Sequence, residues 1–361
     1  MQPLSTGIRW WFESLDQARR QRGVAMDRLG YGPRESTSWI VLSVPGLRLR
    51  CYNDGNTDDD RPVVLIVPAP IKRHYIWDMS PECSVVQHAL KQGMRVYLIE
   101  WEDPDGPTSQ FGLQEYGYTL IDQCVEAIHP GEPEKKVFLL AHSLGGVLAT
   151  IYAARRGERV AGMALIETPL HFGKDSGSFA PLVAFGPPAD RVTQVFERVP
   201  GSVLSMVSSA ASPTTFNAER YADFIASLGS SRHMKNHIQV ERWTLDEAPM
   251  AGALFEQVVE ELYRKDSLMC GKLFIRGRHI GPRSLSSPLL SVYDPHSVVI
   301  PPASVIAFHD AAASRTKQLL RYEGDTGVAL AHVGGLMGEN AHRHLWPQIF
   351  AWLHVLNAVR H

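Results

Sequence analysis

The sequence predicts an α/β protein with a mainly parallel sheet, helices on both faces of that sheet and one long helical insertion. Between residues 63 and 166, short apolar runs rich in β-branched residues alternate with helix-like segments, a pattern typical of parallel strands buried on both faces. From about Pro169 to Met269 no buried strand is expected, and helix-like segments rich in Ser, Pro and Gly follow one another. Because the alternation resumes after residue 288, we expect a cap inserted into one sheet, not a separate domain.

Hydrophobic periodicity and turn residues place the individual elements. The expected strands are an antiparallel pair within 38–52, followed by a charged turn from Asp54 to Asp60, and then 63–67, 95–101, 136–140, 160–166, 288–293 and 317–322. The expected helices are 6–22, 82–92, 113–128, 146–156 and about 346–356. The chain is thereby divided into a first part of the core (1–169), a helical cap (170–265) and a second part of the core (266–361).

The first expected helix carries apolar residues on one side, namely Ile8, Trp11, Phe12 and Leu15. A moderately amphipathic helix of this kind is expected to pack on the body of the protein. The alternative is a helix that lies at an interface.

Composition and charge exclude several classes of protein. The 361 residues are 44% hydrophobic, so a large core can form, and the net charge of −2 gives no electrostatic footprint for nucleic acid or an anionic membrane. The four cysteines lack a CxxC pair, which indicates free thiols in a reducing compartment and no zinc site. No secretory signal or membrane-spanning run is recognisable. We expect a cytoplasmic protein with no stable membrane insertion, no metal and no cofactor, and we leave the oligomeric state open, with a homodimer favoured by frequency alone.

A serine motif follows the strand expected at 136–140. The turn Ala141-His142-Ser143-Leu144-Gly145-Gly146 leads from this strand into a helix. A serine flanked two residues away by small residues, between a strand and a helix, is the nucleophile elbow of the α/β-hydrolase fold. Ala141 and Gly145 meet this steric requirement, with Ala141 in place of the commoner Gly. We therefore predict an α/β-hydrolase fold with Ser143 as nucleophile; the alternative is a serine that only caps the helix.

A serine nucleophile needs a histidine base and a carboxylate that orients it, in the chain order serine, acid, histidine. His332 is the predicted base, because it lies between the last expected strand and the last helix, beside Gly334. His342 and His344 lie nearer the last helix and are expected to face solvent or to cap it. A base of this kind predicts a pH–rate profile that rises through a histidine pKa near neutrality.

Asp294 is the first choice for the acid, because it ends the strand expected at 288–293. Two alternatives stay open. Glu167 follows the earlier strand at 160–166, and Asp325 is close to His332 in sequence.

Two backbone donors are needed to stabilise the oxyanion of an acyl-transfer reaction. The helix start at Leu144 supplies the first. The second should come from the loop after the first buried strand, where Pro68 and Pro70 have no N–H. Ala69 or Ile71 is left, with Ile71 preferred.

Several motifs over roughly residues 60–355 resemble the polyhydroxyalkanoate synthase family. They are Tyr75, Asp78, Ser80-Pro81, Trp101, Asp103-Pro104-Asp105, the Gly145-Gly146 pair, Thr168-Pro169-Leu170, the segment Trp243 to Pro249, and His332 before Gly334. The resemblance implies an α/β-hydrolase core, a helical cap over the site, and hydroxyacyl thioesters or a polyester as substrate class. It also extends the interfacial alternative for the first helix to contact with polyester granules.

The chain departs from the family pattern in two places. Ser143 stands where the family has its nucleophilic cysteine, and Asp294 is followed by three residues before Val298, more than in the family's Asp-His-x-Val-Pro pattern. A serine forms an oxygen ester that water or an alcohol can attack, whereas a thiolate suits repeated thioester exchange. We therefore expect an esterase, thioesterase or acyltransferase acting on a small acyl ester or acyl-CoA. The alternatives are a synthase that uses serine and an inactive granule or binding protein.

Overall fold

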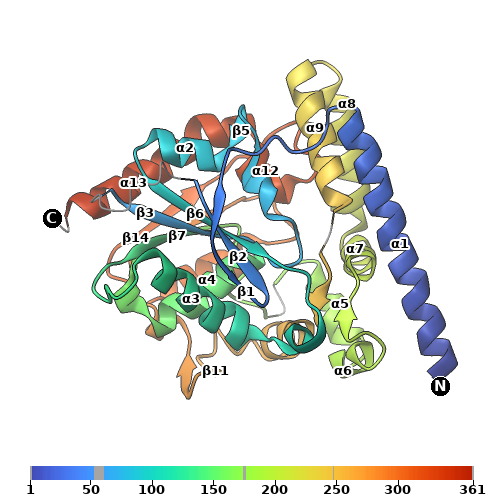
Figure 1. The fold of residues 1–361 in the computed structure, drawn as a ribbon, viewed down its shortest axis with the longest axis horizontal. Coiled ribbons are helices and arrows are strands. Elements are labelled where there is room, and N and C mark those ends of the chain that lie inside the picture. Colours follow the sequence, from blue (N-terminus) through green and yellow to red (C-terminus); the bar gives the residue numbers. More distant parts are fainter. Residues whose placement is uncertain (1, 53–60, 174–175, 247, 360–361) are drawn as a thin grey trace.

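The computed structural model describes residues 2–52, 61–173, 176–246 and 248–359. Within these residues one sheet has the strand order β1-β2-β6-β3-β7-β8-β13-β14 (Figure 1). From β6 to β14 the neighbours pair in parallel, whereas β2 pairs antiparallel with β1 and β6. The strands are β1 (Trp39–Val44), β2 (Leu47–Cys51), β3 (Val63–Val67), β6 (Arg95–Trp101), β7 (Val137–His142), β8 (Val160–Ile166), β13 (Leu289–Tyr293) and β14 (Lys317–Arg321). The expected strands are confirmed with small shifts at their ends, and the charged turn from Asp54 to Asp60 lies outside the described residues.

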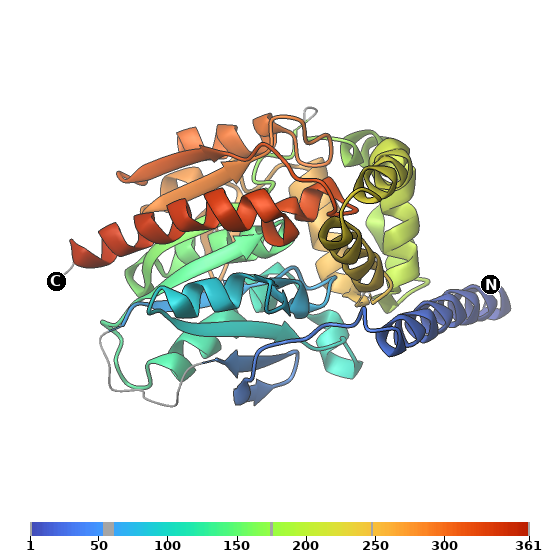
Figure 2. The same cartoon turned by 90° about the horizontal axis from the view of Figure 1, so that it is seen from above.

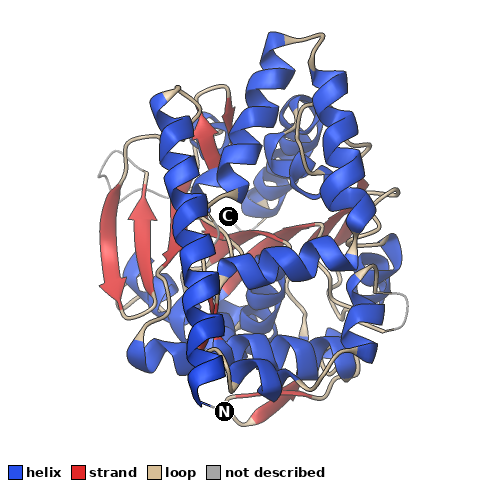
Figure 3. Cartoon of the chain, turned by 90° about the vertical axis from the view of Figure 1, so that its right-hand side faces the viewer, coloured by secondary structure: helices blue, strands red, loops and turns tan. Residues whose placement is uncertain are grey.

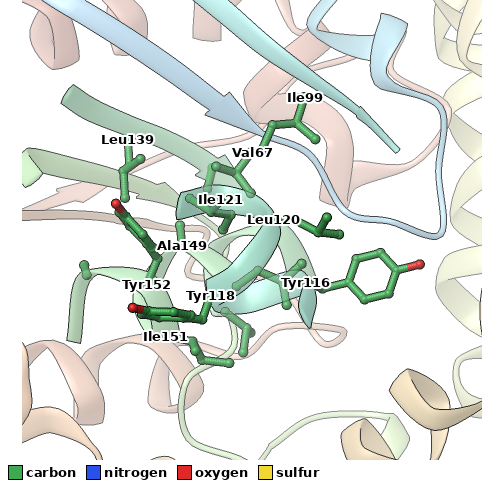
Figure 4. Packing of buried hydrophobic residues seen from close by; sticks show 14 of the residues in the cluster. Val67, Ile99, Tyr116, Tyr118, Leu120, Ile121, Leu139, Ala149, Ile151 and Tyr152 are labelled. Atoms are coloured by element: carbon green, nitrogen blue, oxygen red, sulfur yellow. The ribbon is translucent and has the colours of Figure 1, made fainter. Parts of the chain in front are cut away.

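The two faces of the sheet bury separate hydrophobic cores. Alternate residues of a strand point to opposite faces, so Leu65 and Leu139 belong to one core, and Ile66 and Leu140 to the other. Figure 4 shows the first core, where side chains of β3 and β7 meet those of α3 and α4. The second core contains α2, α12 and α13. This two-sided burial explains why the strands read as continuous apolar runs.

Helices cover both faces, as Figure 2 shows from above. The predicted helix 113–128 starts with a π-helical turn, η3 (Glu115–Thr119). The predicted helix 82–92 is shorter in the structure, because Cys83–Ser84 forms β5 against β4 (Asp78–Ser80) and Ser84 Oγ caps α2 by accepting the Gln87 N–H at 2.9 Å. The helices are α2 (Val85–Lys91), α3 (Leu120–Ile128), α4 (Leu144–Arg155), α11 (Pro302–Ala311), α12 (Gly334–Met337) and α13 (Trp346–Ala358).

Mostly helical structure fills the chain between β8 and β13. Its helices are α5 (Phe179–Phe185), α6 (Ala189–Thr193), α7 (Gly201–Ala211), α8 (Arg220–Ser227), α9 (Ser231–Thr244), α10 (Gly252–Gln257) and the π-helical η6 (Val258–Arg264). The expectation of helices alone between Pro169 and Met269 is wrong in detail, because β9 (Arg198–Val199) pairs with β10 (Met250–Ala251). Beyond that segment, β11 (Leu273–Ile275) forms a hairpin with β12 (Arg278–Ile280). Strands this short carry no readable periodicity.

The N-terminal helix α1 (Gln2–Arg28) is longer than predicted and packs on α7 and α9, not on the sheet (Figures 1 and 3). Phe12 meets Phe196 edge to face, with ring centroids 5.6 Å apart. Trp11, by contrast, is 52% exposed. Packing therefore accounts for only part of the apolar side of α1. Among the described helices, none combines the length and the hydropathy needed to cross a membrane.

Candidate active site

Ser143 occupies a strained turn at the end of β7. Its φ of 54° and ψ of −132° lie in a region that non-glycine residues rarely adopt. The Ser143 N–H donates to the Ile166 carbonyl of β8 at 3.1 Å, which holds the turn against the neighbouring strand. α4 begins at the next residue, so its unpaired N-terminal N–H groups lie beside the serine. Strain of this kind, held by the surrounding structure, is characteristic of a functional residue.

Gly145 and Gly146 must be small because backbone and side-chain atoms approach them closely. A Cβ at Gly145 would lie 2.2 Å from the Val67 carbonyl oxygen, and one at Gly146 would lie 2.0 Å from Thr168 Oγ1. The sequence analysis derived the requirement at 145 from the elbow, and the structure supplies the contacting atoms. Thr168, which lies just beyond β8, therefore packs closely against Gly146 of the elbow.

His332 lies in the 3-10 turn η8 (Ala331–Val333), between β14 and α12. Its side chain is 18% exposed. His142, the residue before the nucleophile, donates from Nε2 to the His332 carbonyl oxygen at 2.8 Å, and the two rings stack 4.5 Å apart. Burial lowers the pKa of His332 to about 4, opposed by the charge of Asp294. The imidazole is therefore neutral at pH 7, as a general base requires.

Glu167 provides the carboxyl group that contacts this histidine. Its Oε2 lies 3.2 Å from His332 Nδ1, and in the tautomer that leaves Nε2 available for Ser143 the Nδ1–H donates to it. Glu167 directly follows β8, has a φ of 42° and is fully buried. Burial and the neighbouring Asp294 raise the pKa of Glu167 well above the ordinary carboxyl value, which favours its protonated form.

Asp294 was the first choice of the sequence analysis, but within the described residues it makes no hydrogen bond to His332. Its Oδ1 accepts the N–H of His296 at 2.8 Å, within its own loop. It still acts on His332 through its charge, which favours the protonated imidazole. Asp325 is occupied elsewhere, because it accepts the Tyr322 hydroxyl at 2.6 Å. The site thus has two carboxyl groups, Glu167 in contact and Asp294 nearby.

Ser143 and His332 line one cavity of about 630 Å³. Ala69, Ile71 and Leu144, the expected sources of oxyanion donors, line it too. Leu144 is the first residue of α4, so its N–H has no acceptor within the helix. The cavity brings the predicted nucleophile, base and donor residues together. Apolar residues from α5, α6, α7 and η6 form much of its wall: Leu182, Val183, Val192, Leu204, Val207 and Val258.

The histidines set aside in the sequence analysis lie away from the cavity. His344 is exposed, as expected. The expectation for His342 is wrong, because it is buried, with Nε2 2.8 Å from the Leu336 carbonyl and 3.3 Å from Cys83 Sγ. No group of three His, Cys, Asp or Glu side chains in the described ranges is arranged to hold a metal ion.

Sequence reasoning missed the role of His142, which fixes the backbone of the base. The only signal was its place directly before the nucleophile.

Comparison with known proteins agrees with this fold. The family model described as alpha/beta hydrolase fold matches residues 62–196, which contain β3 to β8 and the elbow. Among solved structures, a soluble variant of monoglyceride lipase from Saccharomyces cerevisiae superposes with a TM-score of 0.56 at 14% identity, covering 90% of this chain and 96% of that one. The sheet order, the elbow and the family model define an enzyme of the α/β-hydrolase fold class.

Within that class, the chain is similar to proteins named poly(3-hydroxyalkanoate) polymerase subunit PhaC, as the sequence motifs indicated. The protein from Haloferax mediterranei is 28% identical over 92% of this chain, and the one from Thiocystis violacea is 26% identical over 90%. This chain spans 66% of the Haloferax protein and 61% of its Haloarcula marismortui counterpart, but 88% of the Thiocystis protein.

Proposed function

We propose that this chain is a serine acyl-transfer enzyme that acts on hydroxyacyl or acyl thioesters and esters. The observation that carries the proposal is that the strained Ser143 shares one cavity with His332, whose pKa is lowered by desolvation. A strained serine that merely capped α4 would need no histidine in its cavity, and Ser143 makes no side-chain capping bond to that helix. The fold class and the PhaC relatives support acyl-transfer chemistry.

In the proposed reaction, Ser143 Oγ attacks the carbonyl carbon of the substrate while its proton passes to His332 Nε2. The N–H groups of Leu144 and Ile71 stabilise the oxyanion. The C–S or C–O bond then breaks, and the leaving thiol or alcohol takes the proton from His332. In the second half of the reaction, water or a hydroxyl acceptor attacks the Ser143 ester and loses its proton to His332. The bond between the acyl carbon and Ser143 Oγ then breaks, and His332 returns the proton to Ser143 Oγ.

The proton on His332 is stabilised from two sides. Glu167 accepts from Nδ1 and fixes the ring, and Asp294 supplies negative charge nearby. In this proposal Asp294 therefore contributes to catalysis through its charge and not through a hydrogen bond to His332.

The cavity lining supports an anionic thioester such as an acyl-CoA. Six basic side chains line it together with apolar residues, and no carboxylate of the described residues does so. Arg73, Arg220 and Arg264 each pair with a carboxylate, namely Asp103 at 2.8 Å, Glu241, and Glu260 at 3.2 Å. Arg22, on exposed α1, has no ion-pair partner within the described part of the chain. The basic residues are Arg19, Arg22, Lys72, Arg73, Arg220 and Arg264.

In this proposal the helices of residues 170–265 form a cap that holds the acyl group. They supply much of the apolar wall of the cavity, and Arg22 of α1 is available for a phosphate of a carrier. A neutral ester would gain nothing from this cation.

A second candidate is a polyester polymerase that uses serine in place of cysteine. The similarity to PhaC proteins over about nine tenths of the chain favours it. The two candidates differ in the acceptor, which is water or a small alcohol in the first and the hydroxyl of a growing chain in the second.

One experiment separates them. The purified chain is incubated with 3-hydroxyacyl-CoA substrates of several lengths and with p-nitrophenyl esters, and released thiol, free acid and polymer are measured. We expect thiol release with free acid from the wild type and none from Ser143→Ala. Polymer from the wild type would establish the second candidate. Equal turnover by Ser143→Ala would refute both.

The variant Ser143→Cys serves as the informative partner. If the cavity is built for chain growth, the cysteine should raise polymer yield. If it is built for hydrolysis, the cysteine should change the rate of thiol release without polymer.

A further inference from the structure

An aspartate of the cap holds the loop that carries the proposed base. Asp223 on α8 accepts the N–H of Gly327 at 2.7 Å through Oδ1 and the N–H of Ala329 at 2.8 Å through Oδ2. These two donors precede His332 by only five and three residues in the chain. A single carboxylate of the insertion therefore binds the loop that carries His332, which lies more than a hundred residues further along the chain.

The same loop has a backbone that needs external support. Gly327 and Ala329 have φ values of 81° and 55°, and Ala is a residue that rarely adopts such an angle. Gly327 also lies directly on α9, since a Cβ there would be 2.7 Å from His233 Cα. The loop is thus seated on the cap by close packing, with Asp223 satisfying its N–H groups.

Asp223 is itself held in place. His237 on α9 has a side chain only 4% exposed, and its Nδ1 lies 2.7 Å from Asp223 Oδ2. His237 Nε2 lies 3.7 Å from Glu241, which pairs with Arg220 in the cavity wall. The contacts therefore continue from the loop of the base, through α8 and α9, to a residue at the substrate cavity.

We propose that Asp223 is a positioning residue for His332. It couples the position of α8 in the cap to the position of the His332 imidazole. The inference rests on the proposed role of His332. The His332 backbone is then fixed from two sides, by His142 of β7 through its carbonyl and by Asp223 through the loop that precedes it. Displacement of α8 would release the second support and misplace the imidazole. Whatever moves the cap thus also changes the reactivity of Ser143.

The test uses Asp223→Asn and Asp223→Ala in the full chain. Asn keeps the shape and one acceptor oxygen, but its amide NH₂ faces one of the two backbone donors. Because a misplacement of about 1 Å can cost about 10²-fold in rate, we expect kcat for a short p-nitrophenyl ester to fall about 10- to 100-fold with KM nearly unchanged. The reaction rate of Ser143 with a fluorophosphonate should fall by a similar factor. Glu219→Gln is the matched control, because Glu219 is an exposed carboxylate of the same cap segment, and it should retain wild-type rates.

Thermal unfolding and amide hydrogen exchange separate positioning from loss of fold. In Asp223→Asn we expect faster exchange at Gly327 and Ala329 in a protein that still unfolds cooperatively; if Asp223→Ala does not fold, the Asn variant carries the test. A folded Asp223→Asn with wild-type kcat and wild-type fluorophosphonate rate would overturn the inference. A change in KM alone, confined to long acyl substrates, would also overturn it, since that is the result for a residue that only shapes the pocket. If instead His332→Ala leaves the wild-type rate intact, the proposed function fails and not the Asp223 contact.

Discussion

Replacement of Glu167 by Gln should be tolerated much better than replacement of Asp294 by Asn, although Glu167 is the group in contact with His332. Burial and Asp294 raise the pKa of Glu167 well above the ordinary carboxyl value, which favours the neutral acid. A neutral acid and an amide both offer a carbonyl oxygen to the Nδ1–H of His332. Asp294, in contrast, supplies charge that favours the imidazolium formed during the reaction.

The expected magnitudes follow from these contacts. Glu167→Gln alters one neutral hydrogen bond, worth about 0.5–1.5 kcal/mol, so kcat/KM should fall by about tenfold or less. Glu167→Ala leaves the buried Nδ1–H without a partner, at a cost of about 1–3 kcal/mol, or about 5- to 150-fold. Asp294→Asn removes an attraction of about 3 kcal/mol, the value for charges a few ångströms apart at an effective dielectric constant of about 20, so the loss should be about 10²-fold.

The assay is steady-state hydrolysis of a short p-nitrophenyl ester at pH 7.5, with thermal unfolding of each variant as the control for folding. If folded Glu167→Gln loses as much activity as Asp294→Asn or more, Glu167 is the ionised orienting acid and the reasoning from its burial is wrong.

Three further predictions concern the pH response, the elbow and the cations of the cavity. The His332 imidazole must be neutral to accept a proton, and desolvation lowers its pKa to about 4, so kcat/KM should stay flat from neutral pH to about pH 5 and fall below that. A midpoint near neutrality in the pH–rate profile, as the sequence alone predicted, would contradict the burial argument. Gly145→Ala should abolish measurable turnover, because its Cβ would meet the Val67 carbonyl oxygen. The loop that carries Ile71 cannot move away without losing the proposed oxyanion donor. An active variant in the same ester assay would count against the elbow. Arg22→Ala should raise KM for an acyl-CoA several-fold and leave KM for a neutral ester unchanged, and parallel changes for both substrates would argue against a phosphate contact.

The sequence predicted the sheet and the turn at Ser143 well for physical reasons. Strands such as β3 and β7 are buried on both faces, so every residue is apolar, and their pattern does not depend on distant contacts. The elbow is equally local, because the steric demands on Ala141 and Gly145 arise from the turn that contains them.

The acid could not be assigned in this way. Glu167 and Asp294 both directly follow strands of the sheet, and their positions along the chain are equivalent for the purpose of a triad. The difference comes from the φ of 42° at Glu167 and from the His296 N–H that holds Asp294, and both are tertiary features.

The contact between Asp223 and the loop that carries His332 could not be predicted from the sequence either, because the two segments share no sequence pattern that would place them together. The same holds for α1, whose apolar side predicted packing but not the cap as its partner.

The central claim is that Ser143 forms a covalent acyl-enzyme with the help of His332. Rapid acid quench of the wild type with a 3-hydroxyacyl-CoA, followed by intact-mass measurement and peptide mapping, tests it most directly. The account predicts one acyl group on the peptide that contains Ser143, and a greatly reduced yield in His332→Ala. Steady turnover with an acyl group mapped to another residue, or turnover that persists in Ser143→Ala, would contradict it.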